Sequence, residues 1–209
     1  MEKTDSSGTW YLFDYGMVIS AEPEPEDWAA LERETGLRGL AAASGPYWNH
    51  RDDYDAGRHT PAQYWARVLG RPVGAEQLRA LEELDAAQWA HVNADTLAVL
   101  ETLSEEGARL ALLSNMPASM ADQYLREAAW PARFTRTFFS GPLGMSKPDP
   151  RIFTHVLDEL GAVPADVVFI DDNVRNIEAA RELGLHTVHF RPGTDLRQEL
   201  ARFRERSGH

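Results

Sequence analysis

Short apolar runs that stop at a polar or turn-forming residue recur along the chain. Runs of this length are typical of strands buried inside a sheet. They cover residues 10–13, 110–113, 138–140, 167–170 and 187–190. The run 138–140 is the shortest of them and carries the weakest signal. The pattern therefore predicts a sheet of four or five strands.

Stretches with helical periodicity lie between the later runs, and each is followed by a glycine of the kind that ends helices. They cover residues 96–106, 149–160 and 173–183. Alternation of strands and helices favours a parallel sheet with helices on both faces. We therefore expect an α/β fold with a doubly wound parallel sheet, in which ligands bind beyond the carboxyl ends of the strands.

The stretch from residue 21 to residue 93 differs from the rest because it is rich in aromatic residues and contains no clear strand. Helical periodicity covers residues 27–40, 61–69 and 75–89. We interpret this stretch as a helical insertion between the first and second strands. The sequence thus predicts a core formed by residues 1–20 and 94–209, and a helical cap formed by residues 21–93.

Composition narrows the classes of partner. The 209 residues include 21 Lys and Arg against 33 Asp and Glu, which gives a net charge of −12. Such a surface disfavours nucleic acids and anionic membranes, so we expect neither as a partner. The chain has no cysteine, which excludes disulfides and thiolate chemistry. With no membrane-length apolar run and no signal-peptide pattern, we expect a cytoplasmic protein, as a monomer or homodimer.

Polar side chains follow three of the predicted strands at the edge where an α/β sheet places its site. Asp14 ends the first, Ser114 and Asn115 end the second, and Asp171 and Asp172 end another. A single aspartate in such a place is usually a turn former or a helix cap. Three such endings in one sheet indicate a functional site.

Lys147, one of two lysines in the chain, is a candidate partner for these carboxylates because the prolines that follow it, Pro148 and Pro150, would hold it rigidly. Carboxylates that converge without cysteine suit a hard cation such as Mg²⁺. An ionised aspartate can also attack phosphorus as a nucleophile. Ser114, Asn115 and Lys147 could then hold the phosphoryl oxygens. Mg²⁺ and the lysine would make this acidic protein locally attractive to an anionic substrate.

Four segments, taken together, resemble the haloacid dehalogenase-like hydrolase superfamily, in particular its branch with a small helical cap. The segments are residues 13–19 (Phe-Asp-Tyr-Gly-Met-Val-Ile), 113–115 (Leu-Ser-Asn), 147–153 (Lys-Pro-Asp-Pro-Arg-Ile-Phe) and 169–180, which begins Phe-Ile-Asp-Asp-Asn. The resemblance extends from about residue 10 to residue 203. It implies a Rossmann-like core and a cap inserted where the helical stretch lies.

The resemblance also implies roles for individual residues. Asp14 would be the nucleophile and a Mg²⁺ ligand, together with the backbone carbonyl of Gly16 and the carboxylate of Asp172. Asp171 would act through water or hydrogen bonds. The phosphoryl group would be held by Ser114 and Lys147, with Asn115 and Asn176 as supporting residues. The expected substrate is a small phosphorylated metabolite.

The sequence departs from the superfamily pattern at Gly16, where most of its phosphatases carry a second aspartate as general acid and base. The next position, usually glycine, is Met17. General acid–base catalysis contributes about 10²–10⁴-fold to rate. Good leaving groups would lessen this loss, and similar sequences with glycine here include sugar-1-phosphate phosphatases. Alternatively, a cap residue supplies the proton, and the candidates are His50, Asp52, Asp53 and His59.

Two further functions stay open. A 2-haloacid dehalogenase needs no acid, because halide leaves without a proton, but the paired carboxylates Asp171 and Asp172 argue against this reaction. A catalytically silent binding or scaffold protein would have no need for Asp14, Lys147 and Asp172 together. We therefore expect a phosphatase.

The cap segment around residues 44–54 combines aromatic and charged residues in a way that suits either binding or packing. Tyr47, Trp48 or Tyr54 could stack on a substrate ring, and Arg51 could contact an anion. The alternative is that these side chains pack the helical cap. The sequence alone leaves both interpretations open.

Overall fold

The computed structural model of the chain describes residues 8–207, with side chains as far as Arg204. Its five-stranded sheet is entirely parallel, and the strand order is β3-β2-β1-β4-β5. The strands are β1 (Trp10–Phe13), β2 (Arg109–Ser114), β3 (Arg136–Phe139), β4 (Val167–Asp171) and β5 (His186–His189). All five expected strands are present, and the doubly wound α/β fold is confirmed.

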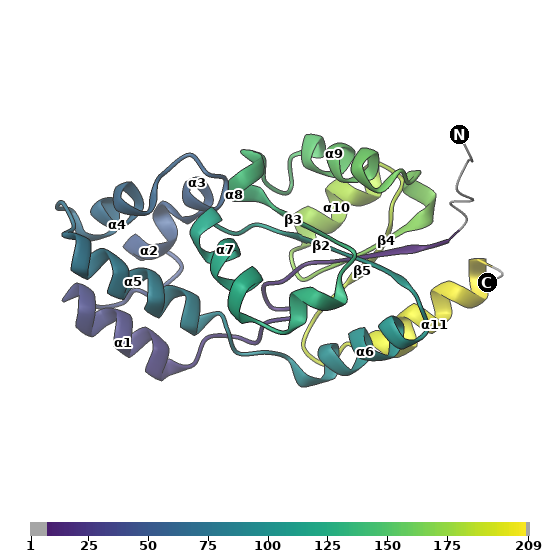
Figure 1. The fold of residues 1–209 in the computed structure, drawn as a ribbon, viewed down its shortest axis with the longest axis horizontal. Helices are drawn as coiled ribbons and strands as arrows, with labels where there is room; N and C mark the ends of the chain where they lie inside the picture. The colour runs from purple at the N-terminus through teal and green to yellow at the C-terminus, as the bar shows by residue number, and fades with distance from the viewer. Residues whose placement is uncertain (1–7, 208–209) are drawn as a thin grey trace.

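Helices cover both faces of the sheet (Figure 1). One face carries α9 (Pro150–Leu160) and α10 (Val174–Glu182). The other carries α6 (Ala94–Glu105), α7 (Ala118–Glu127) and α11 (Leu196–Ser207). Short helical turns complete the core domain: η1 (Trp130–Arg133), α8 (Ser140–Leu143) and η2 (Pro164–Asp166).

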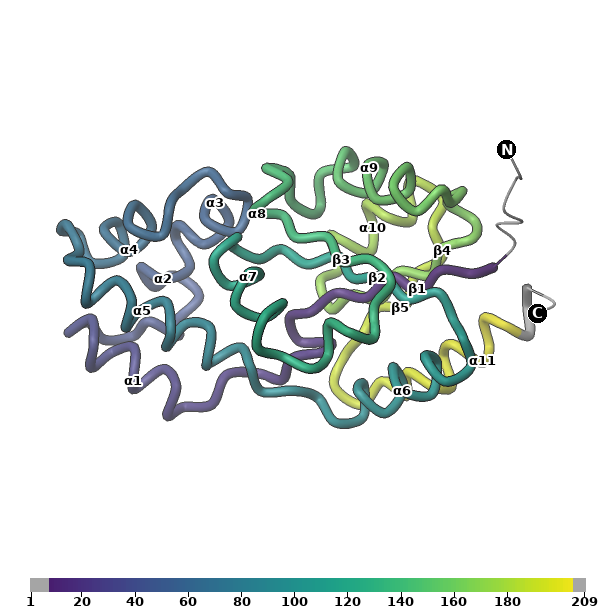
Figure 2. Tube along the Cα trace, in the orientation of Figure 1, coloured from purple at the N-terminus to yellow at the C-terminus, as the bar shows by residue number. Residues whose placement is uncertain are grey.

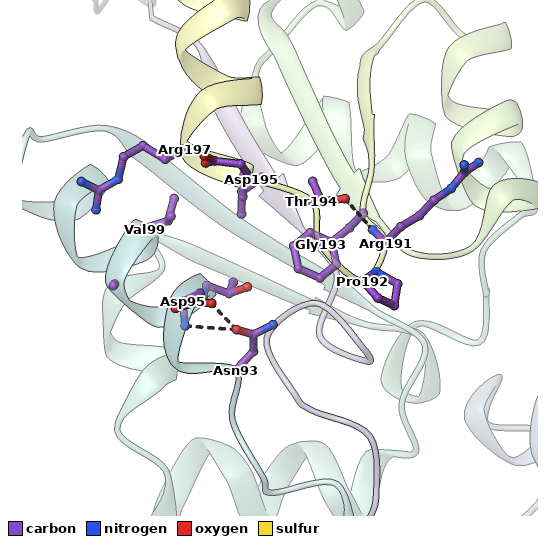
Figure 3. Close-up of a pocket in the computed structure, with 13 residues that line it drawn as sticks. Asn93, Asp95, Val99, Arg191, Pro192, Gly193, Thr194, Asp195 and Arg197 are labelled. Atoms are coloured by element: carbon purple, nitrogen blue, oxygen red, sulfur yellow. Dashed lines mark hydrogen bonds between the residues drawn. The ribbon is translucent and has the colours of Figure 1, made fainter.

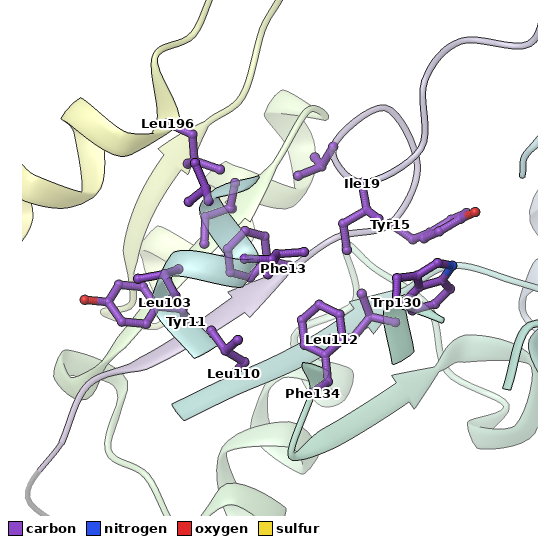
Figure 4. Close-up of a cluster of buried hydrophobic side chains, with 14 of the residues drawn as sticks. Tyr11, Phe13, Tyr15, Ile19, Leu103, Leu110, Leu112, Trp130, Phe134 and Leu196 are labelled. Atoms are coloured by element: carbon purple, nitrogen blue, oxygen red, sulfur yellow. The ribbon is translucent and has the colours of Figure 1, made fainter. Parts of the chain in front are cut away.

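The central strand β1 shows why the strand sequences are apolar without interruption. Tyr11 and Phe13 point into the cluster under α6, α7 and α11, which Figure 4 shows together with Trp130. Trp10 and Leu12 point into the cluster under α9 and α10. Successive side chains of a strand alternate between faces, so a sheet covered on both sides requires apolar residues at every position.

The remaining helices form a separate group beyond the carboxyl ends of the strands (Figures 1 and 2). They are α1 (Pro25–Thr35), α2 (Pro46–Asn49), α3 (Arg51–Asp55), α4 (Pro61–Leu69) and α5 (Ala75–Gln88). This group has a hydrophobic cluster of its own, centred on Leu31, Tyr64, Trp65 and Leu81. We call these helices the cap. Two antiparallel chain segments join the cap to the core where Ser20 pairs with Val92.

One expected cap helix is too long. The periodicity predicts a helix over residues 27–40, but α1 ends at Thr35 and Gly36 adopts a left-handed conformation with φ 72°. Glycine reaches this conformation without a steric penalty and stops the helix. Leu40 continues the apolar periodicity in the sequence, but it is buried in the cap from an irregular segment. No helix in residues 8–207 combines the length and apolar character needed to cross a bilayer.

Candidate active site

The ends of β1 and β4 bring two carboxylates to one buried ammonium group. The Nζ atom of Lys147 lies 2.8 Å from Oδ1 of Asp14 and 2.7 Å from Oδ2 of Asp171. It also donates to the carbonyl oxygen of Leu113 at 2.9 Å. Lys147 is only 4% exposed. All three hydrogens of the ammonium group therefore have acceptors within the protein.

Asn115 holds the lysine in place through its backbone. Its side-chain Nδ2 donates to the carbonyl oxygen of Lys147, and its Oδ1 accepts from the backbone N–H of Lys147, both at 2.9 Å. The amide group thus makes one donor and one acceptor hydrogen bond to the backbone of Lys147, as a residue of a neighbouring strand would. This explains how an asparagine after β2 fixes a loop that follows β3 and α8.

Asp171 is fully buried, and its carboxylate is surrounded by donors. Oδ1 accepts from the backbone N–H of Asn173 at 2.8 Å, and Nδ2 of Asn176 lies 3.1 Å from both carboxylate oxygens. With Lys147 on Oδ2, the hydrogen-bonding capacity of this group is largely used. The geometry suits a residue that orients its neighbours.

Asp14 and Asp172 have oxygens that remain available. Among residues 8–207, Oδ2 of Asp14 and the side chain of Asp172 make no hydrogen bond to another side chain or backbone group. One oxygen from each of Asp14, Asp171 and Asp172 lies within 4.8 Å of the others, and no other such group was found among the described residues. Hard carboxylate oxygens at this spacing fit Mg²⁺.

The electrostatics of the three carboxylates also favour a cation. Burial raises the pKa of Asp14 well above its usual range; Lys147 opposes this shift, and Asp171 adds to it. Burial and the charge of Asp171 raise the pKa of Asp172. Burial alone would lower the pKa of Lys147, but Asp14 and Asp171 raise it. A divalent cation would offset the repulsion among the carboxylates.

The turn after Asp14 has two unusual positions. A Cβ atom added at Gly16 would meet nothing within 4 Å, so the site has room for a side chain there. Met17, where the superfamily usually has glycine, has φ 56°. Its backbone N–H donates to Oγ of Ser20 at 3.2 Å. Met17 thus adopts the left-handed conformation that favours glycine, and its backbone is strained as a result.

A cavity of about 120 Å³ lies where the cap meets the core. From the core, Gly16, Ser114 and Asn115 line it, and from the cap, Trp48 and Arg51 do so. The remaining lining residues are Tyr15, Asp55, Trp89, Met116 and Met120. The structure therefore brings two of the four expected cap residues to the cavity. It adds Asp55 and Trp89, which sequence reasoning did not place there.

Tyr47 and Tyr54 lie elsewhere, which corrects the expectation that they contact a substrate. Their exposed fractions are 0% and 2%, and both belong to the hydrophobic cluster of the cap. The hydroxyl of Tyr47 donates to Asp85 at 2.6 Å, and that of Tyr54 donates to Glu82 at 2.8 Å. Their rings pack the cap, and their hydroxyl groups are satisfied inside it.

The expected cap acids also lie outside the cavity lining: His50, Asp52, Asp53 and His59. Asp53 pairs with Arg58 at 2.6 Å, and His59 lies 3.7 Å from the same carboxylate. Asp52 is exposed. Asp53 and His59 are engaged with each other, Asp52 faces solvent, and none of the four lines the cavity, so the structure does not place them where they could donate a proton.

A larger open cavity of about 550 Å³ lies on the core, between the start of α6 and the loop before α11 (Figure 3). Its polar residues cap helices: Oδ1 of Asn93 accepts from Asp95 and Thr96, and Oδ1 of Asp195 accepts from Gln198. None of the predicted site residues lines it. The smaller cavity is lined by Gly16, Ser114 and Asn115, although Asp14, Lys147, Asp171 and Asp172 do not line it, and it is therefore the candidate active site.

Comparison with known proteins agrees with this geometry. The family model described as haloacid dehalogenase-like hydrolase matches residues 21–184. The chain belongs to the haloacid dehalogenase-like hydrolase family. A haloacid dehalogenase-like enzyme from Bacteroides thetaiotaomicron, solved with magnesium and inorganic phosphate, superposes with a TM-score of 0.73 at 22% identity. The superposition covers 92% of this chain and 99% of that one, and it shows a shared fold.

Curated relatives of this haloacid dehalogenase-like protein differ in activity. It is 30% identical over 105 residues to a flavin mononucleotide hydrolase of Arabidopsis thaliana, covering 49% of this chain and 42% of the relative. It is 29% identical over 204 residues to (S)-2-haloacid dehalogenase 4A of Burkholderia cepacia, covering 91% and 86%. The chain spans less than half of the length of several curated relatives that it matches.

Proposed function

We propose that this haloacid dehalogenase-like protein is a Mg²⁺-dependent phosphatase that hydrolyses a small phosphate monoester through an aspartyl-phosphate. One observation supports this proposal above the others: one carboxylate oxygen from each of Asp14, Asp171 and Asp172 lies within 4.8 Å of the others, beside a lysine that is ion-paired with Asp14 and Asp171. This arrangement provides a nucleophile, cation ligands and a fixed positive charge at one edge of the sheet. Relatives named as phosphatases add support.

Asp14, Asp172 and the backbone carbonyl of Gly16 would hold Mg²⁺, and Asp171 would orient Lys147 and Asn176 around it. When bound, the cation neutralises the charge of the phosphoryl group and of the carboxylates. The fit rests on the donor set, which is all oxygen; Oδ1 of Asp14 is engaged by Lys147 and by the backbone N–H of Tyr15, and its Oδ2 is left for a cation.

The chain's own residues then account for the transfer. An oxygen of Asp14 attacks phosphorus, and the bond from phosphorus to the leaving oxygen breaks. Lys147 opposes the rise in the pKa of Asp14 that burial causes, and it can offset charge on the phosphoryl oxygens. Ser114 lines the cavity at the end of β2, where its hydroxyl can donate to the same oxygens. Water then hydrolyses the aspartyl-phosphate and restores Asp14.

The cavity favours a small substrate with a good leaving group. Its volume is about 120 Å³, and Gly16 offers no acid on the core side. Sugar 1-phosphates and aryl phosphates release oxygens that are more acidic than those of simple alcohols. We include both classes in the proposed substrate range.

A dehalogenase is the second candidate, because the relative matched over 91% of this chain carries that activity in its name. The pair Asp171 and Asp172 is better suited to a cation than to a metal-free displacement. Release of chloride from 2-chloropropionate in the presence of a chelator would support the dehalogenase instead.

The test is a screen of phosphorylated metabolites with Mg²⁺, run on the wild type and on Asp14→Asn. It includes sugar 1-phosphates, sugar 6-phosphates, nucleotides, flavin mononucleotide and an aryl phosphate. We expect release of inorganic phosphate from at least one substrate by the wild type and none by the variant. Inactivity on the whole panel would favour a binding or scaffold protein.

A further inference from the structure

Asp55 is the last residue of α3 and a cap carboxylate that lines the same cavity as Gly16. Contacts with the core hold it there. Oγ of Ser140, at the start of α8, donates to the backbone carbonyl of Asp55. Two residues later, Gly57 approaches the backbone of Gly141 so closely that an added Cβ would lie 2.3 Å from its carbonyl oxygen. The end of α3 is thus docked directly on the core.

The carboxylate of Asp55 has one engaged oxygen and one free oxygen. Oδ1 accepts from Nε of Arg51 at 2.7 Å. Within residues 8–207, Oδ2 accepts no hydrogen bond, and it is not among the buried polar atoms without a partner. The side chain is 15% exposed. Asp55 lines the cavity together with Gly16 and Ser114, so its free oxygen is available there.

Arg51 pairs with the carboxylates of both Asp55 and Asp85. Its Nη1 lies 2.9 Å from Oδ2 of Asp85, and it also donates to the hydroxyl of Tyr47. Asp85 is 1% exposed, so Arg51 is committed to it deep inside the cap. The single positive charge of Arg51 faces the two carboxylates of Asp55 and Asp85. A proton on Asp55 would bring the net charge of these three groups to zero.

We propose that Asp55 is the general acid and base that replaces the aspartate missing at Gly16. The proposal rests on the proposed phosphatase function. It identifies a proton donor on the cap rather than on the core, so proton transfer would depend on the cap being closed over the substrate.

The environment of Asp55 is consistent with this role. Burial raises the pKa of Asp55 to about 7, Arg51 opposes the shift, and Asp85 and Asp52 contribute to it. A catalytic acid works best when its pKa lies near the operating pH. The group can then hold a proton before transfer and accept one afterwards at neutral pH.

The proton balance is complete over the two steps. In the first, Asp14 bonds to phosphorus, the leaving oxygen departs and takes the proton from Asp55, and an alcohol is formed. In the second, water attacks the phosphorus of the aspartyl-phosphate and gives a proton to the carboxylate of Asp55. Inorganic phosphate leaves, the Asp14 carboxylate returns, and Asp55 is again protonated.

The test compares the wild type with Asp55→Asn on an alkyl phosphate and on 4-nitrophenyl phosphate, with Mg²⁺ present. Nitrophenolate leaves without a proton, whereas an alkoxide needs one. We expect kcat/KM for the alkyl ester to fall by about 10²-fold or more, and for the aryl ester by much less. In the wild type, kcat/KM for the alkyl ester should decline as pH rises through about 7. The variant should not show this decline in its pH profile.

Glu76→Gln is the control, because Glu76 is an exposed carboxylate of the cap, on α5, and does not line the cavity. It should behave as the wild type does. Asparagine can still accept from Arg51 at position 55, and circular dichroism checks the fold. Equal losses on both esters, or no loss on either, would overturn the role of Asp55. A wild type without activity, or an active Asp14→Asn variant, would overturn the phosphatase function itself.

Discussion

Lys147 and Asp14 form a buried ion pair, with Nζ 2.8 Å from Oδ1, although they are 133 positions apart in the chain. The pair joins the end of β1 to the loop before α9. Asp171 is the second carboxylate on the same ammonium group, at 2.7 Å. The charges of the site are therefore arranged before any ligand arrives, which lowers the cost of reorganisation during the reaction.

Replacing Lys147 by methionine should weaken the protein as well as inactivate it. Removal of one partner from a buried pair leaves unpaired charge and costs about 3–5 kcal/mol. Urea denaturation of Lys147→Met should show a loss of this size in the free energy of unfolding. Arg151→Met is the control, because Arg151 forms an exposed pair with Asp149. Its unfolding midpoint should stay close to that of the wild type.

Mg²⁺ should stabilise the fold in a pH-dependent way. Asp14 and Asp172 have raised pKa values in the free site, so lowering the pH protonates them and removes ligands. At a concentration 100 times Kd the cation adds about 2.7 kcal/mol. The increase in Tm with Mg²⁺ should be larger at pH 8 than at pH 5. Asp172→Asn should lose most of it, whereas the exposed Asp166→Asn should keep it; equal increases at both pH values would contradict the assignment.

Gly16→Asp should restore an acid on the core side. The added Cβ has open space, and the backbone carbonyl stays in place. In the Asp55→Asn background, where the cap donates no proton, we expect kcat/KM for alkyl phosphates to rise by about tenfold or more, since positioned acids contribute about 10²–10⁴-fold. Gly16→Asn supplies the same volume without a transferable proton. If both variants gain equally, the effect is not acid catalysis.

Met17 should report the strain in the turn. Its φ of 56° is unfavourable for any residue with a Cβ and worst for β-branched ones. We expect Met17→Gly to raise the free energy of unfolding by up to about 1 kcal/mol, and Met17→Val to lower it. Thermal denaturation monitored by circular dichroism measures both. A more stable valine variant would contradict a strained turn.

The core was predictable because its signals are local. Asp14, Ser114 and Asp171 each end an apolar run, and parallel strands bring such ends to one edge. The two hydrogen bonds between the Asn115 amide and the backbone of Lys147 could not be predicted from the sequence. They join two loops whose distance depends on the packing of α8.

The cap was less predictable for a physical reason. Tyr47 lies on α2 and Asp55 ends α3, the next helix, yet one packs inward and the other lines the cavity. Which side faces the core is decided by the docking of α3 on Ser140, a contact between residues 85 positions apart. No periodicity within residues 44–54 encodes that contact.

The most direct test of the central claim is the rate of aryl phosphate hydrolysis by Asp14→Asn with saturating Mg²⁺. Asparagine keeps the shape of the side chain but cannot attack phosphorus as a carboxylate does. The proposed mechanism predicts that hydrolysis falls to the background rate while circular dichroism shows a folded protein. Hydrolysis by the folded variant at the wild-type rate would contradict Asp14 as the nucleophile.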